Sequence, residues 1–370
     1  MKIAIVHDYL NQFGGAERVI SALHEIWPEA PIYTSIYNSK KMPDIFSSMD
    51  IRTSFMQRFP FVFNLFKWYL LFYPFAFKSF DLSEYDVILS SSSAWAKGIR
   101  KRKEQLHICY CYTPMRFVWR YDDYVKRENF GFLIKAILPL VLKPIKKWEL
   151  ETVKEVDNFI AISKTIAERI RMTYRRKSDI IYPPVECSLF QPSNLDQDYF
   201  LVVSRLNSYK RIDIVVKAFN RLELPLKIIG DGPDRKPLQR MANSNIEFLG
   251  RRSDEELKQY LAGCRALVFP GEEDFGIVPV EAMSVGRPVI AYRAGGAEET
   301  VIDGLTGVFF NEQMVESLVA AVNKFQLNTF EKNKIREHAL KFDKEVFKER
   351  IKNLVNSKFT VFRDKEPCNN

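Results

Sequence analysis

Two carboxylates, Glu273 and Glu281, frame a short loop in the second half of this 370-residue chain. Apolar runs at 266–269 and 287–292 predict buried strands before the loop and after the short helix that follows it. Because an ionised Glu only accepts hydrogen bonds, it suits paired hydroxyl donors such as those of a sugar or a ribose. We therefore expect one Glu to bind a sugar and the other to bind a ribose. A solvated acidic loop and the carboxylate pair of a glycosidase are the alternatives.

The start of the predicted helix suits a phosphate. Pro279 fits a first helical turn, and Gly286 fits the left-handed position after the last turn. Backbone N–H groups at Phe275, Gly276 and Ile277 would lie at the positive end of the helix, where anions bind. In a parallel sheet, ligands bind at the loops that follow the strands, and this loop is one of them.

Two cations follow another predicted strand of the same sheet. Arg205 and Lys210 come after the strand pattern at 199–203, at the carboxyl edge that also carries the acidic loop. There they could hold a diphosphate and neutralise it as it leaves, without a metal. Ordinary surface charge is the alternative. Asp196 and Asp198 have the spacing used by metal-dependent sugar transferases, but they precede the strand, so we predict no metal site.

A glycine pair, Gly14 and Gly15, follows the first strand pattern at 2–6 and precedes a helix expected from Arg18 to Ile26. In a Rossmann-like domain this is where the backbone approaches a phosphate. The GxGxxG pattern is missing, so NAD is not expected. A glycine pair that only turns the chain is the alternative.

Strand and helix patterns alternate through both halves of the chain and are interrupted at Pro183 and Pro184. This alternation predicts an α/β protein with two Rossmann-like, doubly wound domains facing a cleft. We assign residues 1–185 to the first domain and 186–341 to the second. Residues 342–370 would form a C-terminal helix that could cross back to the first domain.

The positive charge lies in the first half. The net charge is +9; residues 1–187 hold 28 Lys and Arg against 20 Asp and Glu, and the rest holds 27 against 26. Nucleic acid and an anionic membrane are the partners that such an excess fits. No nucleic-acid-binding motif is present, and the basic residues lie beside apolar runs. We therefore expect a membrane surface as partner, and no nucleic acid.

Two apolar stretches could form the membrane-facing surface. Residues 55–80 contain twelve aromatics, and residues 132–148 mix aliphatic side chains with four lysines, among them Lys143, Lys146 and Lys147. Neither has the run of about 20 apolar residues that spans a bilayer. Docking at the membrane interface is therefore expected, with ordinary core-facing helices as the alternative.

The cysteines and the N-terminus favour a reduced, cytoplasmic protein. The five cysteines are odd in number, and Cys109 and Cys111 alternate within a strand-like run. The four histidines have no zinc-binding spacing. The first six residues run directly into a strand pattern and do not have the layout of a signal peptide.

Together these motifs resemble the retaining glycosyltransferases of family 4, which have the GT-B fold. The shared motifs are FPGEEDFGIVPVEAMSVGRPVIA with Glu273 and Glu281, the cations Arg205 and Lys210, IGDGP at 229–233, and Gly295, Gly296, Glu298 and Glu299. Gly14 and Gly15 match the glycine loop of the family's N-terminal domain. The segments HDYL, GGAER and YTPMR are similar to the bacterial O-antigen and exopolysaccharide branch, in which mannosyl transfer from GDP-mannose is common.

The resemblance implies a role for each motif. Glu273 would contact the donor sugar and Glu281 the ribose, while Arg205 and Lys210 would hold the diphosphate. Further donor contacts are implied at Gly14, Gly15, Phe275, Gly276 and Ile277 and, near the base, at Gly250, Arg251 and Arg252. No metal and no cofactor are implied. A donor phosphate oxygen would take the acceptor proton in a front-face, retaining reaction.

The implied activity is hexose transfer from a nucleotide sugar, GDP-mannose first, to a lipid-linked saccharide in bacterial surface polysaccharide synthesis. The first domain would bind this acceptor, and the enzyme would sit peripherally on the cytoplasmic face of the inner membrane. A non-catalytic nucleotide-sugar-binding subunit of an assembly complex is the alternative. An epimerase or phosphorylase is a third, but we find no motif for a pyridoxal phosphate lysine.

Tyr112 departs from the family pattern. The strand before Thr113 often ends in a His that approaches the donor sugar, and Tyr112 stands in its place. With a pKa of about 10, a Tyr donates hydrogen bonds but is a poor base at neutral pH. Activity survives if the donor phosphate is the base. Otherwise the chain only binds its donor, unless His7 compensates; a core or cleft-lining role for His7 is equally compatible with the sequence.

Overall fold

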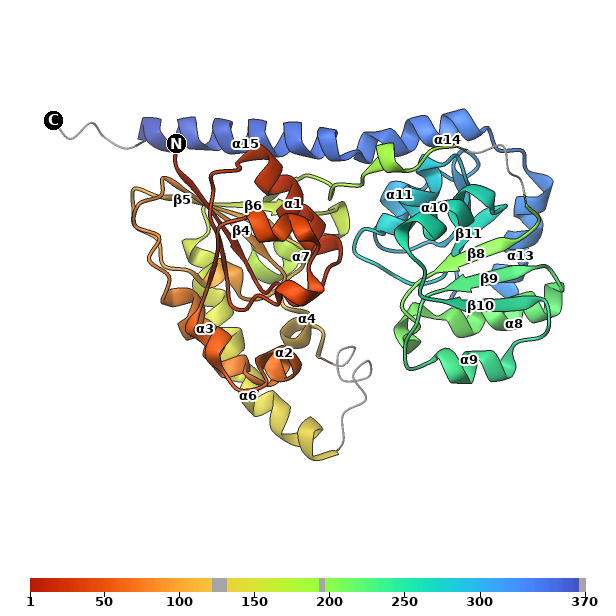
Figure 1. Cartoon of the computed structure of the whole chain (residues 1–370), viewed down its shortest axis with the longest axis horizontal. Helices are drawn as coiled ribbons and strands as arrows, with labels where there is room; N and C mark the ends of the chain where they lie inside the picture. Colours follow the sequence, from red (N-terminus) through yellow and green to blue (C-terminus); the bar gives the residue numbers. More distant parts are fainter. Residues whose placement is uncertain (122–131, 193–196, 366–370) are drawn as a thin grey trace. The chain divides into compact units, whose positions relative to one another are not determined.

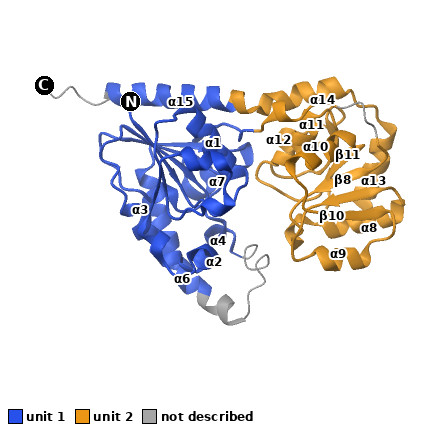
Figure 2. Ribbon diagram, in the orientation of Figure 1, with its two compact units in different colours: residues 1–184, 347–370 blue, residues 185–346 orange. Residues whose placement is uncertain are grey.

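The computed structural model describes residues 1–121, 132–192 and 197–365, and of residues 132–137 and 365 only the backbone. The chain forms two compact units (Figure 2): unit 1 is Met1–Pro184 with Phe347–Asn370, and unit 2 is Val185–Val346. Residues 342–346, which we assigned to a separate C-terminal segment, thus belong to unit 2.

Unit 1 is built on a parallel sheet of seven strands, in the order β3-β2-β1-β4-β5-β6-β7 (Figure 1). The order reverses between β1 and β4, so the switch point of this sheet lies between them. The strands are β1 (Ile3–His7), β2 (Ile32–Thr34), β3 (Ile51–Thr53), β4 (Val87–Ser92), β5 (Leu106–Cys111), β6 (Asn158–Ala161) and β7 (Ser178–Ile180).

Helices cover both faces of this sheet. Its α-helices are α1 (Gly15–Ile26), α2 (Val62–Leu65), α3 (Tyr73–Lys78), α4 (Arg116–Trp119), α6 (Phe132–Thr152), α7 (Lys164–Tyr174) and α15 (Lys344–Lys365). The sheet face with Val6 packs against α2, α3 and α6 in one core. On the opposite face Phe347 of α15 packs edge-on against Tyr110, with ring centroids 5.7 Å apart. Lys358 of the same helix pairs with Asp179 at 3.0 Å.

A buried ion pair anchors α6 in unit 1. Lys97 Nζ lies 3.0 Å from Glu149 Oε1, and both side chains are fully buried. Trp119 Nε1 donates to Glu149 Oε2 at 2.6 Å, and the Tyr174 hydroxyl donates to Oε1. The carboxylate is therefore paired and also hydrogen-bonded, which is what a charge needs in the interior.

Unit 2 has a parallel sheet of six strands in the order β10-β9-β8-β11-β12-β13, with its switch point between β8 and β11. Its strands are β8 (Phe200–Val203), β9 (Leu226–Ile229), β10 (Ile246–Gly250), β11 (Ala266–Phe269), β12 (Val289–Tyr292) and β13 (Gly307–Phe310). The two parallel sheets confirm the predicted α/β class with doubly wound domains.

The helices of unit 2 alternate with its strands. They are α8 (Ile212–Leu222), α9 (Arg235–Met241), α10 (Asp254–Gly263), α11 (Ile277–Ser284), α12 (Ala297–Thr300), α13 (Val315–Leu327) and α14 (Lys332–Ala339). One apolar core joins β8, β11 and β12 to α8 and α13. Ser253 begins α10 with a reciprocal capping box to Glu256.

Several elements differ from the sequence predictions. Helix α1 begins at Gly15 rather than at Arg18, so the glycine pair itself forms the helix start. Strands β2, β3 and β7 were not predicted, because runs of three residues are too short for a clear period. The four-residue strand β13 was also not predicted. The segment 55–80 forms short 3-10 turns and the helices α2 and α3. It buries Tyr73 and Phe77 but leaves Phe61 and Phe75 exposed.

Candidate functional site

The carboxyl edge of the unit 2 sheet is formed by loops that pack backbone on backbone. A side chain at Gly230, after β9, would overlap the carbonyl of Ser204, after β8. Gly232 lies against the backbone of Leu206 in the same way. The sequence IGDGP therefore brings the loop after β9 into contact with the loop that carries Arg205.

The loops after β11 and β12 meet in the same manner. Gly296 N donates to Glu273 O at 2.8 Å, and a Cβ on Gly296 would overlap the backbone of Phe275. Gly295 adopts φ +62°, and its Cα faces the Glu273 carbonyl. Glycine is required at both positions by close approach. The GG pair thus fixes the acidic loop in place.

Lys210 and Glu273 come together across the switch point of unit 2. Lys210 Nζ donates to Glu273 Oε1 in a close ion pair, although 63 residues separate the two in the chain. Arg205 is exposed and forms no ion pair with any residue whose position is described. The structure therefore joins two of the predicted residues directly and leaves a cation beside them on the same edge.

Helix α11 begins next to this ion pair. Its N-cap is Gly276, with φ +88°, and no side chain caps it. The N–H groups of Ile277 and Val278 precede the first bond of the helical ladder and point out of the helix end. Pro279 is the third helical residue, within the first turn, and Gly286 follows the C-cap at φ +78°, both as expected. Glu281 is buried within α11.

The residues predicted near the base lie at the edge of the unit 2 sheet. Gly250 ends the edge strand β10 with φ +71°, and a Cβ there would lie 3.3 Å from the Arg235 guanidinium. Arg251 is exposed. Arg252 pairs with Glu256 at 3.2 Å, one turn into α10. These three residues share the carboxyl edge with Lys210 but not its immediate surroundings.

The carboxyl edge of the unit 1 sheet is organised by Asp8, which the sequence analysis did not single out. Its buried carboxylate accepts hydrogen bonds from the backbone N–H groups of residues 93–96, at 2.6–2.9 Å. The hydroxyls of Ser92 and Ser93 donate to it at 3.2 and 2.8 Å. One carboxylate at the end of β1 thus folds the loop after β4.

The remaining predicted residues lie at this edge of unit 1. Gly14 is the N-cap of α1 and Gly15 its first residue. The Tyr112 hydroxyl donates to Ala16 O at 3.1 Å and shares a 2.8 Å hydrogen bond with Ser91 Oγ. Burial raises the pKa of Tyr112 well above its usual value. The phenol is therefore a neutral hydrogen-bonding group.

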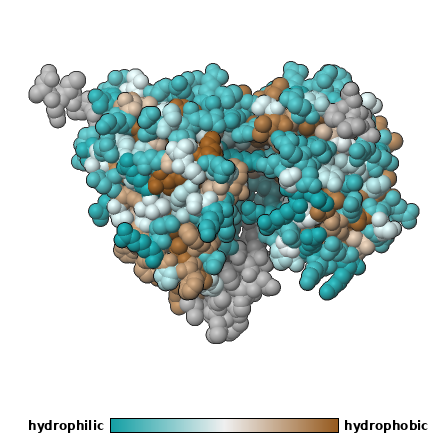
Figure 3. Space-filling model, in the orientation of Figure 1, coloured by the Kyte–Doolittle hydropathy of each residue, from teal (hydrophilic) through white to brown (hydrophobic). Residues whose placement is uncertain are grey.

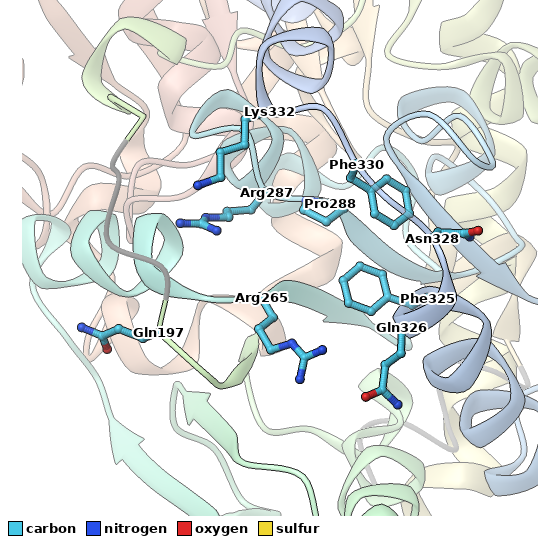
Figure 4. Close-up of a pocket in the computed structure, with 10 residues that line it drawn as sticks. Gln197, Arg265, Arg287, Pro288, Phe325, Gln326, Asn328, Phe330 and Lys332 are labelled. Carbon is cyan, nitrogen blue, oxygen red and sulfur yellow. The ribbon is translucent and has the colours of Figure 1, made fainter.

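A cavity of about 240 Å³ lies at the opposite edge of the unit 2 sheet (Figure 4). Two arginines line it: Arg265 directly precedes β11, and Arg287 is separated from the start of β12 by Pro288. Arg265 pairs with Asp198 at 3.0 Å, and Arg287 Nε donates to Ala262 O at 2.8 Å. Asp196 lies outside the described residues. None of the predicted donor residues lines this cavity.

Neither a membrane-spanning helix nor a metal cluster is found within residues 1–121, 132–192 and 197–365. No helix in these ranges is long and apolar enough to cross a bilayer. No three His, Cys, Asp or Glu side chains in them gather in a way that could hold a metal ion.

Comparison with known proteins covers nearly the whole chain. The model for Glycosyltransferase Family 4 matches residues 13–189, and the model for Glycosyl transferases group 1 matches residues 189–342. An uncharacterized glycosyltransferase of Methanocaldococcus jannaschii is 31% identical over 180 residues, which span 46% of this chain and 51% of that protein. The match therefore spans about half of that relative.

Two further proteins are similar over a larger part. The O-antigen chain mannosyltransferase C of Escherichia coli is 30% identical over 261 residues, 66% of this chain and 68% of that protein. The crystal structure of Anabaena HepE in complex with UDP has a TM-score of 0.73 at 18% identity, covering 96% of this chain and 100% of that one. The structural likeness shows the fold. The two family models and the relative in Escherichia coli show that the chain belongs to glycosyltransferase family 4.

Proposed function

We propose that this protein transfers a hexose from a nucleotide diphosphate sugar to a saccharide carried on a lipid, with retention of configuration. The donor binds at the carboxyl edge of unit 2, and GDP-mannose is the first donor to test. The observation that carries the proposal is the Lys210–Glu273 pair at the switch point, beside the uncapped start of α11.

The chemistry of this edge fits a diphosphate leaving group. When the bond to the anomeric carbon breaks, negative charge develops on the diphosphate and must be neutralised. Arg205 and Lys210 supply fixed positive charge, and the first N–H groups of α11 add hydrogen-bond donors. Glu273 holds Lys210 in place and has a second oxygen for a donor-sugar hydroxyl.

The remaining donor contacts are proposed from the family resemblance. Glu281 is assigned to the ribose, and the edge formed by Gly250, Arg251 and Arg252 to the base. The relative in Escherichia coli is named a mannosyltransferase, which supports mannose as the sugar. The Anabaena protein binds UDP, so a uridine donor belongs in the first experiments.

Donor binding and turnover test the proposal directly. GDP-mannose and UDP-glucose are titrated calorimetrically, and release of GDP or UDP is followed with and without a polyprenyl-pyrophosphate saccharide. We expect one donor to bind and its nucleotide to be released faster with the acceptor. Binding without turnover would identify a non-catalytic binding subunit. Absence of binding by a panel of nucleotide sugars would contradict the proposal.

Arg205→Ala tests which cation contacts the donor. Losing a hydrogen bond to a charged group costs about 1.5–3 kcal/mol, so donor affinity should fall roughly 10- to 100-fold. Arg240→Ala is the matched control, because Arg240 is also an exposed Arg and lies in the last turn of α9. Equal affinity of the two variants would remove Arg205 from the site.

Unit 1 carries an exposed apolar surface that we propose as the membrane contact. This aromatic platform consists of Phe61, Trp68, Leu71, Phe72 and Phe75, which are 46–77% exposed. Figure 3 shows hydrophobic residues gathered over the α2 and α6 part of unit 1. Arg58, Lys67 and Lys78 are exposed in the same segment. Rings with interspersed cations suit an anionic lipid interface, proposed here to be the cytoplasmic face of the inner membrane.

Flotation with vesicles of phosphatidylglycerol and phosphatidylcholine tests membrane docking of unit 1. The triple change of Lys143, Lys146 and Lys147 to Glu reverses the charge on the exposed side of α6 and should abolish flotation. The control triple Lys40→Glu, Lys41→Glu and Lys103→Glu changes the net charge equally at other exposed sites and should float. Equal flotation of both triples would contradict membrane docking through this surface.

A further inference from the structure

Helix α14 packs against α11, the helix whose first N–H groups we assign to the donor (Figure 1). Arg336 of α14 donates hydrogen bonds to Ser284 O, at the last residue of α11, and to Phe190 O at 2.6 Å. His338, also in α14, and Phe342, in the turn after it, are 8% and 5% exposed. A buried histidine beside the helix of a ligand site requires an explanation.

His338 donates a hydrogen bond to the end of α12. Its Nε2 lies 2.9 Å from Thr300 O, which can only accept, so Nε2 carries the hydrogen. Burial lowers the pKa of His338, and the ring is therefore neutral at pH 7. Nδ1 is buried and has no hydrogen-bond partner within the described part of the chain. The polar role of this side chain is thus to hold the C-terminal carbonyl of α12, which has no partner inside its own helix.

From Thr300 a series of hydrogen bonds leads to the acidic loop. Thr300 N and Thr300 Oγ1 both donate to Gly296 O, at 3.0 and 3.2 Å. Gly296 N in turn donates to Glu273 O, and the Glu273 carboxylate holds Lys210. Because α12 is a single turn, its position depends on the groups that hold its two ends. His338 holds one end, and the backbone of Glu273 holds the other.

Phe342 provides a second connection to the acidic loop. Its ring lies edge-on to Phe275, with centroids 5.7 Å apart, and edge-on to the imidazole of His338 at 5.5 Å. The carbonyl of Phe342 accepts a hydrogen bond from Val185 N at 3.1 Å, so its own position is fixed by the backbone. Phe275 directly precedes Gly276, the N-cap of α11. The three stacked rings therefore support the residue from which the donor helix starts.

We propose that His338 and Phe342 are positioning residues for the donor site. His338 places Glu273 through α12, and Phe342 places the first turn of α11 through Phe275. The inference rests on the proposed transferase function, in which the Glu273 carboxylate and the first N–H groups of α11 act on the donor. Such groups must be held to within about 0.5 Å of their productive positions, which requires support from the residues behind them. Ordinary core packing of α14 is the alternative, and it predicts a loss of stability without a specific effect on the acidic loop.

Amide hydrogen exchange of residues 273–300, followed by mass spectrometry on the full chain, tests the placement of the loop without any substrate. His338→Phe keeps a ring against Phe342 but removes the hydrogen bond to Thr300 O. We expect exchange in this segment to become about tenfold faster, as for the loss of one hydrogen bond. The amide nitrogen of His338→Gln can reach the Nε2 position, so this variant should exchange like the wild type.

Asn245→Ala is the matched control for a lost side-chain hydrogen bond in unit 2. Asn245 Nδ2 donates to Phe219 O, in the last turn of α8, at 3.0 Å and to Leu224 O at 2.7 Å. Like His338, it therefore holds a carbonyl at a helix end, but it lies before β10, away from the acidic loop. Exchange of residues 273–300 should be unchanged in this variant.

Turnover with the donor that the wild type uses tests the link to function. We expect His338→Phe to lower kcat about tenfold and His338→Gln to keep most of it. In a Glu273→Gln background, His338→Phe should lower kcat less than about twofold, because the carboxylate that it places is already absent. Phe342→Leu keeps the apolar volume but removes the ring contact with Phe275. It supplies an independent perturbation should His338→Phe fail to fold, and it should also speed exchange in 273–300 about threefold.

Three results would overturn the inference. The first is exchange of residues 273–300 at the wild-type rate in His338→Phe and Phe342→Leu. The second is equally fast exchange in Asn245→Ala, which would indicate a general loosening of unit 2. The third is a fall of kcat in His338→Phe that is the same with and without Glu273→Gln. Failure of the proposed function is distinguishable, because the wild type would then neither bind nor turn over any nucleotide sugar, while the exchange rates still decide whether His338 and Phe342 hold the loop.

Discussion

The two switch points of this molecule are built in opposite ways. In unit 1, side chains hold the edge: the Asp8 carboxylate accepts hydrogen bonds from four backbone N–H groups of the loop after β4 and from the hydroxyls of Ser92, at the end of β4, and Ser93. In unit 2, backbone lies directly on backbone, and Gly230 and Gly296 are the points of contact. Unit 1 therefore depends on the polarity of its side chains, and unit 2 depends on the absence of a Cβ.

This difference bears on where charge is available for a substrate. Both oxygens of the Asp8 carboxylate already accept hydrogen bonds from the loop after β4. In unit 2 the loops hold each other without side chains, so Lys210, Glu273 and Arg205 can serve a ligand. The Asp8 carboxylate thus serves to hold its own loop, while the glycine-packed edge of unit 2 leaves charged groups for the proposed diphosphate.

Gly230→Ala should have the largest effect, since its Cβ would overlap the Ser204 backbone at φ +133°. We expect a loss of more than about 3 kcal/mol in the free energy of unfolding of unit 2, followed by urea denaturation. Gly304→Ala is the matched control: φ is +78°, and no atom lies within 4 Å of the added Cβ. It should lose about 1 kcal/mol. Similar losses in both variants would show that the loop packing has no special role.

Asp8→Asn should have the next largest effect on stability. The amide removes one acceptor oxygen and leaves two of the four N–H groups of residues 93–96 without a partner. We expect a loss of about 2–4 kcal/mol in the free energy of unfolding of unit 1. Asp50→Asn, an exposed carboxylate of the same unit, should change stability by less than about 1 kcal/mol. An Asp8→Asn protein as stable as the wild type would show that the Asp8 carboxylate does not hold the edge of unit 1.

A smaller effect is expected for the pH dependence of the stability of unit 1. His107 is fully buried in β5, and burial lowers its pKa from the usual 6.5 to about 4. Because the unfolded chain binds the proton more tightly, this contribution to stability is present above pH 6.5 and is lost as the pH falls towards 4. The loss between pH 7 and pH 5 should be about 2 kcal/mol.

His107→Gln tests this contribution, since its amide can still contact Ser90 but does not titrate in this range. As the pH falls, the urea midpoint of the wild type should decrease more than the urea midpoint of the variant. A pH dependence of unfolding that is identical in both proteins would show that His107 is protonated equally in the folded and unfolded states.

Sequence reasoning found the elements with local signals. The apolar run of β11, the glycines of the acidic loop and the spacing of Glu273 and Glu281 all follow from neighbouring residues, and they led to the correct family. Asp8 was missed because its role depends on the pairing of β1 with β4, which lie more than 80 residues apart. No local pattern distinguishes it from an ordinary loop carboxylate.

Two other features needed three-dimensional packing. That Lys210 and Glu273 lie on one edge was predictable from strand order, but their direct pairing depends on the loop contacts at Gly271 and Gly296. In the aromatic segment 55–80 the composition is uniform. The 3-10 turns break the helical period, so buried Phe77 and exposed Phe75 could not be told apart from the sequence.

The most direct test of the donor site is the turnover of Lys210→Met with the donor that the wild type uses. We propose that Lys210 neutralises the negative charge that develops on the leaving diphosphate. Its loss should therefore lower kcat by about 100- to 1000-fold, while the donor KM changes much less. Thermal unfolding of the variant verifies that unit 2 is intact. A correctly folded Lys210→Met protein with the kcat of the wild type would contradict the assignment of the donor to this edge.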